Sequence, residues 1–110
     1  MIIDFENIPW ERLEHFKGGE GALNAQMYWD GTTRIFHGLL EPGSSIGLHR
    51  HEGTCEMIFV ARGQATLLEN GERKTIHAGQ CTYCPEGHEH SLINNSSEEI
   101  EFYATIPQQK

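Results

Sequence analysis

The chain has 110 residues, enough for one domain with a single core. Its formal net charge of −8 argues against binding to nucleic acid or an anionic membrane, because both require clustered lysine and arginine. No apolar run approaches the roughly 20 residues of a membrane-spanning helix, and the acidic N-terminus lacks the features of a secretory signal. We therefore expect a cytoplasmic protein that binds neither nucleic acid nor membrane.

The N-terminal part holds the one helix candidate, Asn7 to Phe16. Pro9 suits a first helical turn, and Glu11, Arg12 and Glu14 are good helix formers. An edge strand is the alternative for this segment. In either form it would cover the outside of the fold.

The rest of the chain is typical of β-structure. Glycine or proline–glycine pairs recur at short intervals, and the stretches between them have strand length and are apolar or alternating. Asn70-Gly71 is the strongest turn signal, because both residues tolerate the positive φ of a tight hairpin. It predicts a hairpin that joins strands over Gln64 to Leu68 and Arg73 to His77. The pattern as a whole indicates an all-β sandwich or barrel.

Four side chains in the middle of the chain have the chemistry of a metal site. His49 and His51 are two residues apart, so on a strand both point to one face. Glu56 shares its face with apolar residues two and four positions further on, and we expect that face to line the interior. His90 shares a face with Leu92 in the same way. Three imidazoles and one carboxylate suit a divalent transition metal.

The spacing of these residues resembles the two sequence motifs of the cupin family. The patterns G-x5-H-x-H-x4-E-x6-G and G-x5-P-x-G-x2-H-x3-N are matched at every fixed position, over residues 43–63 and 79–94. The resemblance implies a single-domain jelly-roll β-barrel over residues 1–110. It also implies that Asn94 is a structural position and that the remaining motif residues shape turns, namely Gly43, Gly63, Gly79, Pro85 and Gly87.

For the metal site, the resemblance implies ligation by His49, His51, Glu56 and His90. Manganese, iron, nickel, copper and zinc all accept this ligand set, so the identity of the metal stays open. Four protein ligands on an octahedral ion would leave two positions for water or a substrate. Two alternatives are a degenerate site that binds metal weakly and a group of hydrogen-bonded histidines without metal.

The family resemblance implies a metal-dependent enzyme that acts on a small organic molecule, of the dioxygenase, decarboxylase, isomerase or lyase type. The alternative is a non-catalytic module of the same fold that binds or senses a small molecule. His37, His88 and Tyr83 are candidates for a general base. For both histidines, a hydrogen-bonded or surface role is the simpler interpretation.

Four further residues near the motifs favour ordinary roles. Cys81 and Cys84 have the spacing of a redox or zinc pair, but residues three apart on a strand face opposite sides, so their thiols should not converge. Cys55 would be reactive only if it were exposed beside the site. Glu52 follows His51 directly, so it should point away from the ligand face into solvent.

An apolar outer surface predicts a homodimer. Met57 and Phe59 alternate with Glu56 and must lie outside the barrel if Glu56 lies inside. A monomer rarely leaves a large contiguous apolar patch exposed, and a two-fold dimer is the commonest way to cover one. The alternative is that the apolar N-terminal residues fold back over Met57 and Phe59 within the same chain; these residues are Ile2, Ile3, Phe5 and Trp10.

Overall fold

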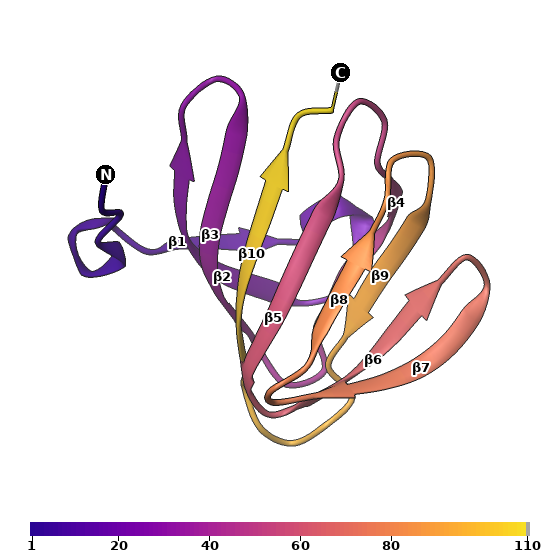
Figure 1. Ribbon diagram of the computed structural model, residues 1–110. Helices are drawn as coiled ribbons and strands as arrows, with labels where there is room; N and C mark the ends of the chain where they lie inside the picture. The colour runs from indigo at the N-terminus through magenta and orange to yellow at the C-terminus, as the bar shows by residue number, and fades with distance from the viewer. Residues whose placement is uncertain (110) are drawn as a thin grey trace.

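Alternating strands and glycine turns build two facing antiparallel sheets in the computed structural model, which describes residues 1–109 (Figure 1). In spatial order, the larger sheet contains β1 (Glu11–Glu14), β2 (Ala22–Trp29), β3 (Thr33–Leu40), β10 (Ile100–Pro107), β5 (Glu56–Arg62) and β8 (Cys81–Cys84). The smaller sheet contains β4 (Ser45–Arg50), β9 (Glu89–Ile93), β6 (Gln64–Glu69) and β7 (Glu72–His77). This is the jelly-roll arrangement expected from the sequence.

The N-terminal segment, residues 7–16, takes the strand alternative over Glu11–Glu14, and the short N-terminal helical element is a 3-10 turn that ends at Asn7. β1 pairs with β2 from Glu11 to Glu14, and Leu13 packs against the core. Arg12 donates two hydrogen bonds to the Glu41 carboxylate, each 3.2 Å long. Helix propensity is a weak preference, and here strand pairing and the burial of Leu13 outweigh it.

Two short 3-10 turns are the helical segments of the described residues: η1 (Phe5–Asn7) and η2 (Phe16–Gly18). Asp4 caps η1, because its carboxylate accepts a hydrogen bond from the Glu6 N–H. Within residues 1–109, no helix has the length and apolar character needed to cross a membrane.

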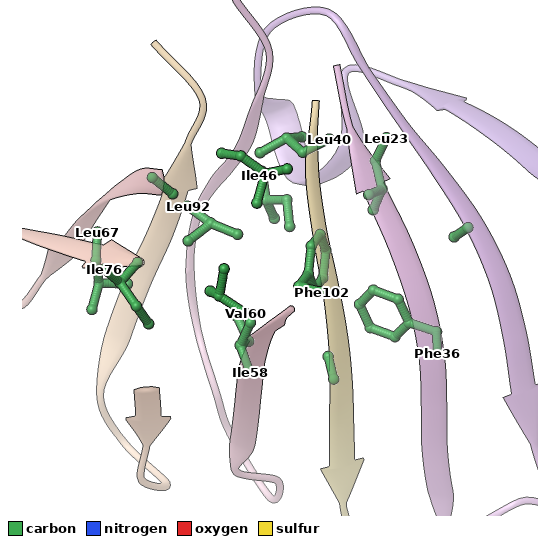
Figure 2. Packing of buried hydrophobic residues seen from close by; sticks show 14 residues of the cluster. Leu23, Phe36, Leu40, Ile46, Ile58, Val60, Leu67, Ile76, Leu92 and Phe102 are labelled. Carbon is green, nitrogen blue, oxygen red and sulfur yellow. The ribbon is translucent and has the colours of Figure 1, made fainter. Parts of the chain in front are cut away.

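The core lies between the two sheets, where the inward side chains of both meet (Figure 2). Phe36 and Phe102 from neighbouring strands pack edge to face, with ring centroids 5.6 Å apart. Gly38 makes room for this arrangement, since a Cβ at that position would lie 2.5 Å from the Phe102 ring. Ile58 and Val60 are buried on the same face of β5 as Glu56, so core packing fixes the direction of that carboxylate.

The turns follow the sequence signals. Asn70 and Gly71 both have positive φ and close the β6–β7 hairpin, as predicted. Asn94 is fully buried and ties neighbouring segments together: its Nδ2 donates to the carbonyls of Leu40 and Glu98. The four motif glycines all adopt positive φ, as expected of turn residues: Gly43, Gly63, Gly79 and Gly87.

The outer face of the larger sheet carries aromatic side chains on three adjacent strands. Phe59, Tyr83 and Tyr103 are 50%, 54% and 38% exposed, on β5, β8 and β10. The N-terminal segment covers only part of this face, where Phe5 packs on Tyr103 with ring centroids 5.6 Å apart. In Figure 1 the N-terminal turn lies beside the β1–β3 end of the sheet, away from β5 and β8. The segment therefore leaves Phe59 uncovered.

Candidate metal centre

Three strands and one connecting segment bring the four predicted ligands together. His49 lies in β4 and faces its register partner His90 in β9. His51 directly follows β4, and Glu56 is the first residue of β5. One ligand atom from each of the four lies within 4.8 Å of the other three.

The donor atoms are closely spaced. His51 Nε2 and His90 Nε2 lie 3.0 and 2.9 Å from Glu56 Oε1, and His49 Nε2 lies 3.8 Å from it. The His90 Nε2 atom is 3.0 Å from that of His51 and 3.2 Å from that of His49. Three of the four side chains are buried, and His49 is partly exposed.

Hydrogen bonds on the far side of two rings set their orientation. His49 Nδ1 lies 2.7 Å from the Gly47 carbonyl oxygen and must donate to it, so in the neutral ring Nε2 carries a lone pair. His51 Nδ1 lies 3.0 Å from Thr54 Oγ1. Fixing a histidine through its second ring nitrogen is the usual way in which proteins aim a ligand at a metal.

The two motifs are also joined through the backbone at His51. Its N–H donates to the His88 carbonyl over 3.0 Å, and its carbonyl accepts from the Gly87 N–H over 2.7 Å. The positive φ of Gly87 is what the turn requires at this point. His51 of the first motif and His90 of the second are thereby held side by side.

Two opposing effects act on the Glu56 carboxyl. Burial alone would raise its pKa, but the three imidazoles of His49, His51 and His90 around the carboxylate outweigh burial and hold the pKa well below its usual range. The carboxylate is therefore ionised at neutral pH. A buried anion surrounded by imidazoles is suited to a cation.

The donor set fits a divalent transition metal. Ligands about 2.1 Å from an ion, at right angles to one another, lie about 3.0 Å apart, which matches most of the spacings among these atoms. In their neutral forms, imidazole nitrogens that face each other with lone pairs repel, and a shared cation removes that repulsion. His49, His51, Glu56 and His90 would hold the ion.

A cavity of about 570 Å³ opens from this cluster. Its apolar wall includes Met27, Phe36, Ile46 and Ile106, and its rim includes the exposed residues Trp29 and Glu52. Three cationic side chains also line it: Lys17, Arg34 and Arg50. A site of this size accommodates a small organic molecule beside the metal.

None of the three candidate general bases lines this cavity. His37 lies on the outer face of β3, with Nε2 2.7 Å from Glu101 Oε2 and Nδ1 2.7 Å from Gln26 Oε1. Tyr83 is on the outer face of β8. His88 is exposed, and its Nδ1 lies 2.8 Å from Asn70 Nδ2. The two histidines thus have the hydrogen-bonded and surface roles that were the simpler interpretation.

The cysteines do not form a second site. Cys81 is exposed and Cys84 is buried, so the two face opposite sides of β8 as predicted. Burial raises the pKa of the Cys84 thiol to about 11, which keeps it protonated. Cys55 is also buried, so the exposure that reactivity requires is missing. Glu52 is exposed as expected, although it lies on the rim of the cavity.

The sequence and the fold are both similar to those of known proteins. Residues 36–106 match the cupin domain family. The chain is 31% identical to a protein of Thermotoga maritima named oxalate-binding protein, over 96% of this chain and 93% of the relative.

Solved structures agree with this relationship. A predicted oxalate decarboxylase of Thermotoga maritima superposes with a TM-score of 0.91 at 30% identity, over 99% of this chain and 100% of that one. An RmlC-like cupin from Shewanella frigidimarina superposes with a TM-score of 0.80 over 99% of this chain and 91% of that one, and at 15% identity it shows the fold alone. The chain belongs to the cupin family.

Proposed function

We propose that this cupin is a metal-dependent enzyme that acts on a small carboxylic acid. The observation that carries the proposal is the convergence of three imidazoles and one ionised carboxylate beside a cavity of about 570 Å³. His49, His51, Glu56 and His90 hold the ion in this proposal. The names of the Thermotoga relatives, which refer to oxalate, support a carboxylate as the ligand.

A bound divalent ion would supply a Lewis acid that polarises a coordinated carboxylate. The protein's own residues supply the surroundings. Gly47 and Thr54 fix the imidazoles, and the apolar wall around Phe36 and Ile46 limits water beside the ligand. The three cationic side chains that line the cavity favour entry of an anion into a chain of net charge −8.

A titration of oxalate into the protein tests the binding step. Calorimetry with Mn²⁺-loaded and metal-free protein should give saturable binding only with the ion present. Glu56→Gln should lose both metal and oxalate binding, whereas His88→Ala, which alters an exposed histidine outside the cavity, should retain both. Equal oxalate affinity with and without metal would contradict the proposal.

The second candidate function is a carboxylate-binding module without catalysis. The lining of the cavity favours it, because an enzyme usually needs a general acid or base in addition to the metal ligands. Among the described lining residues, Glu52 is the one carboxylate besides Glu56. The two candidates separate in a single experiment: ¹³C-labelled oxalate incubated with metal-loaded protein in air. New signals from formate or carbonate that require Glu56 would support the enzyme, and unchanged bound oxalate would support the module.

We also propose that the protein is a homodimer formed through the outer face of the larger sheet. Phe59 on β5 lies beside Tyr103 on β10, and Met57 lies beside Tyr83 on β8. These side chains are contiguous and partly exposed, which is typical of a surface that a partner covers. A second copy would present the same aromatic surface across a two-fold axis.

A further inference from the structure

Arg34 faces the cavity of the metal centre but has no ionic partner among residues 1–109. It lies on the same face of β3 as Phe36. Its guanidinium carbon lies 5.0 Å from the centre of the Trp29 ring, and Nη1 lies 3.4 Å from Met27 Sδ. Thioether sulfur is a weak acceptor, so most of the five guanidinium donors remain available.

Arg34 and Glu56 lie in one row across the inner face of the larger sheet. Thr105 pairs with Met57, so the next residue of β10, Ile106, lies at the level of Glu56. Ile106 in turn pairs with Arg34. Two strand spacings therefore separate the Cα atoms of Arg34 and Glu56, about 10 Å. The cavity has a metal-binding end, an apolar middle at Ile106 and a cationic end.

The other cations of the cavity are differently placed. Arg50 lies 4.0 Å from the Glu89 carboxylate and donates to the Gly87 carbonyl. Lys17 stands over the ring of Phe16, on the strained turn η2. Arg34 alone combines a strand position with an aromatic ring behind its guanidinium. A planar fork held in this way suits the two oxygens of a carboxylate.

We propose that Arg34 binds a second carboxylate of the ligand, and that the preferred ligands are dicarboxylates longer than oxalate. One carboxylate would lie at the metal centre and the other at Arg34, with the hydrocarbon chain over Ile106. The two carboxylates of oxalate are bonded directly to each other, so oxalate cannot occupy both ends. This inference rests on the proposed function, because it needs a ligand held at the metal.

The test compares ligands of different length in calorimetric titrations of the metal-loaded protein. The ligands are oxalate, succinate, glutarate and adipate, together with pentanoate, which has the chain length of glutarate but one carboxylate. The wild-type protein should bind one of the three longer diacids more tightly than oxalate. Arg34→Gln should weaken that diacid by about 10- to 100-fold, the range expected for a lost hydrogen-bonded ion pair.

Controls separate recognition from folding and from net charge. Arg34→Gln should bind pentanoate and oxalate within about twofold of the wild type, and Arg34→Lys should restore part of the diacid affinity. Arg12→Gln removes the same unit of charge from the surface outside the cavity and should change none of the affinities. Metal content and thermal unfolding of each variant report whether the centre and the fold are intact.

The outcomes distinguish this inference from the proposed function. If oxalate binds with metal but no diacid binds more tightly, or if Arg34→Gln weakens diacid and pentanoate equally, the inference is overturned and the proposed function stands. If no carboxylate requires the metal, the proposed function fails, and the inference fails with it.

Discussion

Replacing His90 by alanine should remove much of the stabilisation that a divalent ion gives to the fold. His90 is 2% exposed, and its Nε2 atom lies within 3.2 Å of both other imidazoles and of the Glu56 carboxylate. An ion present at roughly 1,000 times its dissociation constant stabilises the folded state by about 4 kcal/mol. If the loss of one ligand weakens binding about 100-fold, about 2.7 kcal/mol of this is lost. The metal-induced rise in Tm should then shrink by roughly 10 °C.

The assay is thermal unfolding followed by circular dichroism, with chelator-treated protein and with the ion added back. Each variant is compared with its own metal-free form, so the packing lost on truncating His90 cancels. His88→Ala is the matched control, because it removes an exposed histidine two residues away and should keep the full rise. A rise of equal size in His90→Ala and the wild type would refute the assignment of His90 as a ligand.

Four other predictions concern pH, assembly and packing. Metal affinity should fall as the pH drops through about 6.5, where free histidine titrates. The fall should be steeper than the loss of one proton can give, because protons compete with the ion at three histidines. Metal titrations between pH 5 and 7 that show no change in affinity would contradict three-histidine ligation. In the metal-free protein, the pKa of Glu56 is lower in the folded state than its value of 4.5 in the unfolded chain, so ionised Glu56 stabilises the fold above pH 4.5. This stabilisation is lost as the pH falls below 4.5 towards the pKa of the folded state, and Tm should decline in that range. Phe59→Asp should shift the protein towards a 12.5 kDa monomer in light scattering and should retain its metal content. A wild-type protein that is already monomeric at micromolar concentration would exclude the dimer. Gly47→Ala should destabilise the protein by about 3 kcal/mol in chemical denaturation, because the new Cβ would lie 1.9 Å from the Lys17 carbonyl oxygen. Unchanged stability of this variant would show that η2 does not pack on β4 as described.

Period-two alternation predicted that the four candidate ligands share the inner side of the fold, and the structure brings them together there. Glu56 continues the buried face of Ile58 and Val60, so a single parity fixes its direction. The Asn70-Gly71 hairpin was equally predictable, because few residues tolerate its backbone conformation. In both cases a local rule and the global fold require the same arrangement.

Parity could not fix the direction of β3, and with it the lining of the cavity. The run TRIFHGLL is apolar on both faces, with Ile35 and Leu39 on one and Phe36 and Leu40 on the other. Its outer face is partly covered by the N-terminal segment, which no local pattern reveals. Parity alone therefore does not show whether His37 or Arg34 faces the cavity, and the place of β3 between β2 and β10 decides it.

The sequence left the N-terminal segment open between a helix and an edge strand for a related reason. Glu11 to Glu14 has good helix formers and one apolar residue, Leu13, so its local preference is for a helix. Pairing with β2 decides the outcome, and that partner begins eight residues after β1 ends. Arg12 and Glu41 add a contact between residues that are far apart in the sequence.

Anomalous X-ray scattering from crystals of the metal-loaded protein, recorded at the absorption edge of the bound ion, would locate the ion relative to the four proposed ligands. Ligation by the four residues should give one strong anomalous peak per chain, about 2.0 to 2.3 Å from His49 Nε2, His51 Nε2, His90 Nε2 and a Glu56 carboxylate oxygen. A peak at any other group of residues, with these four side chains still in contact with one another and no ion between them, would contradict it.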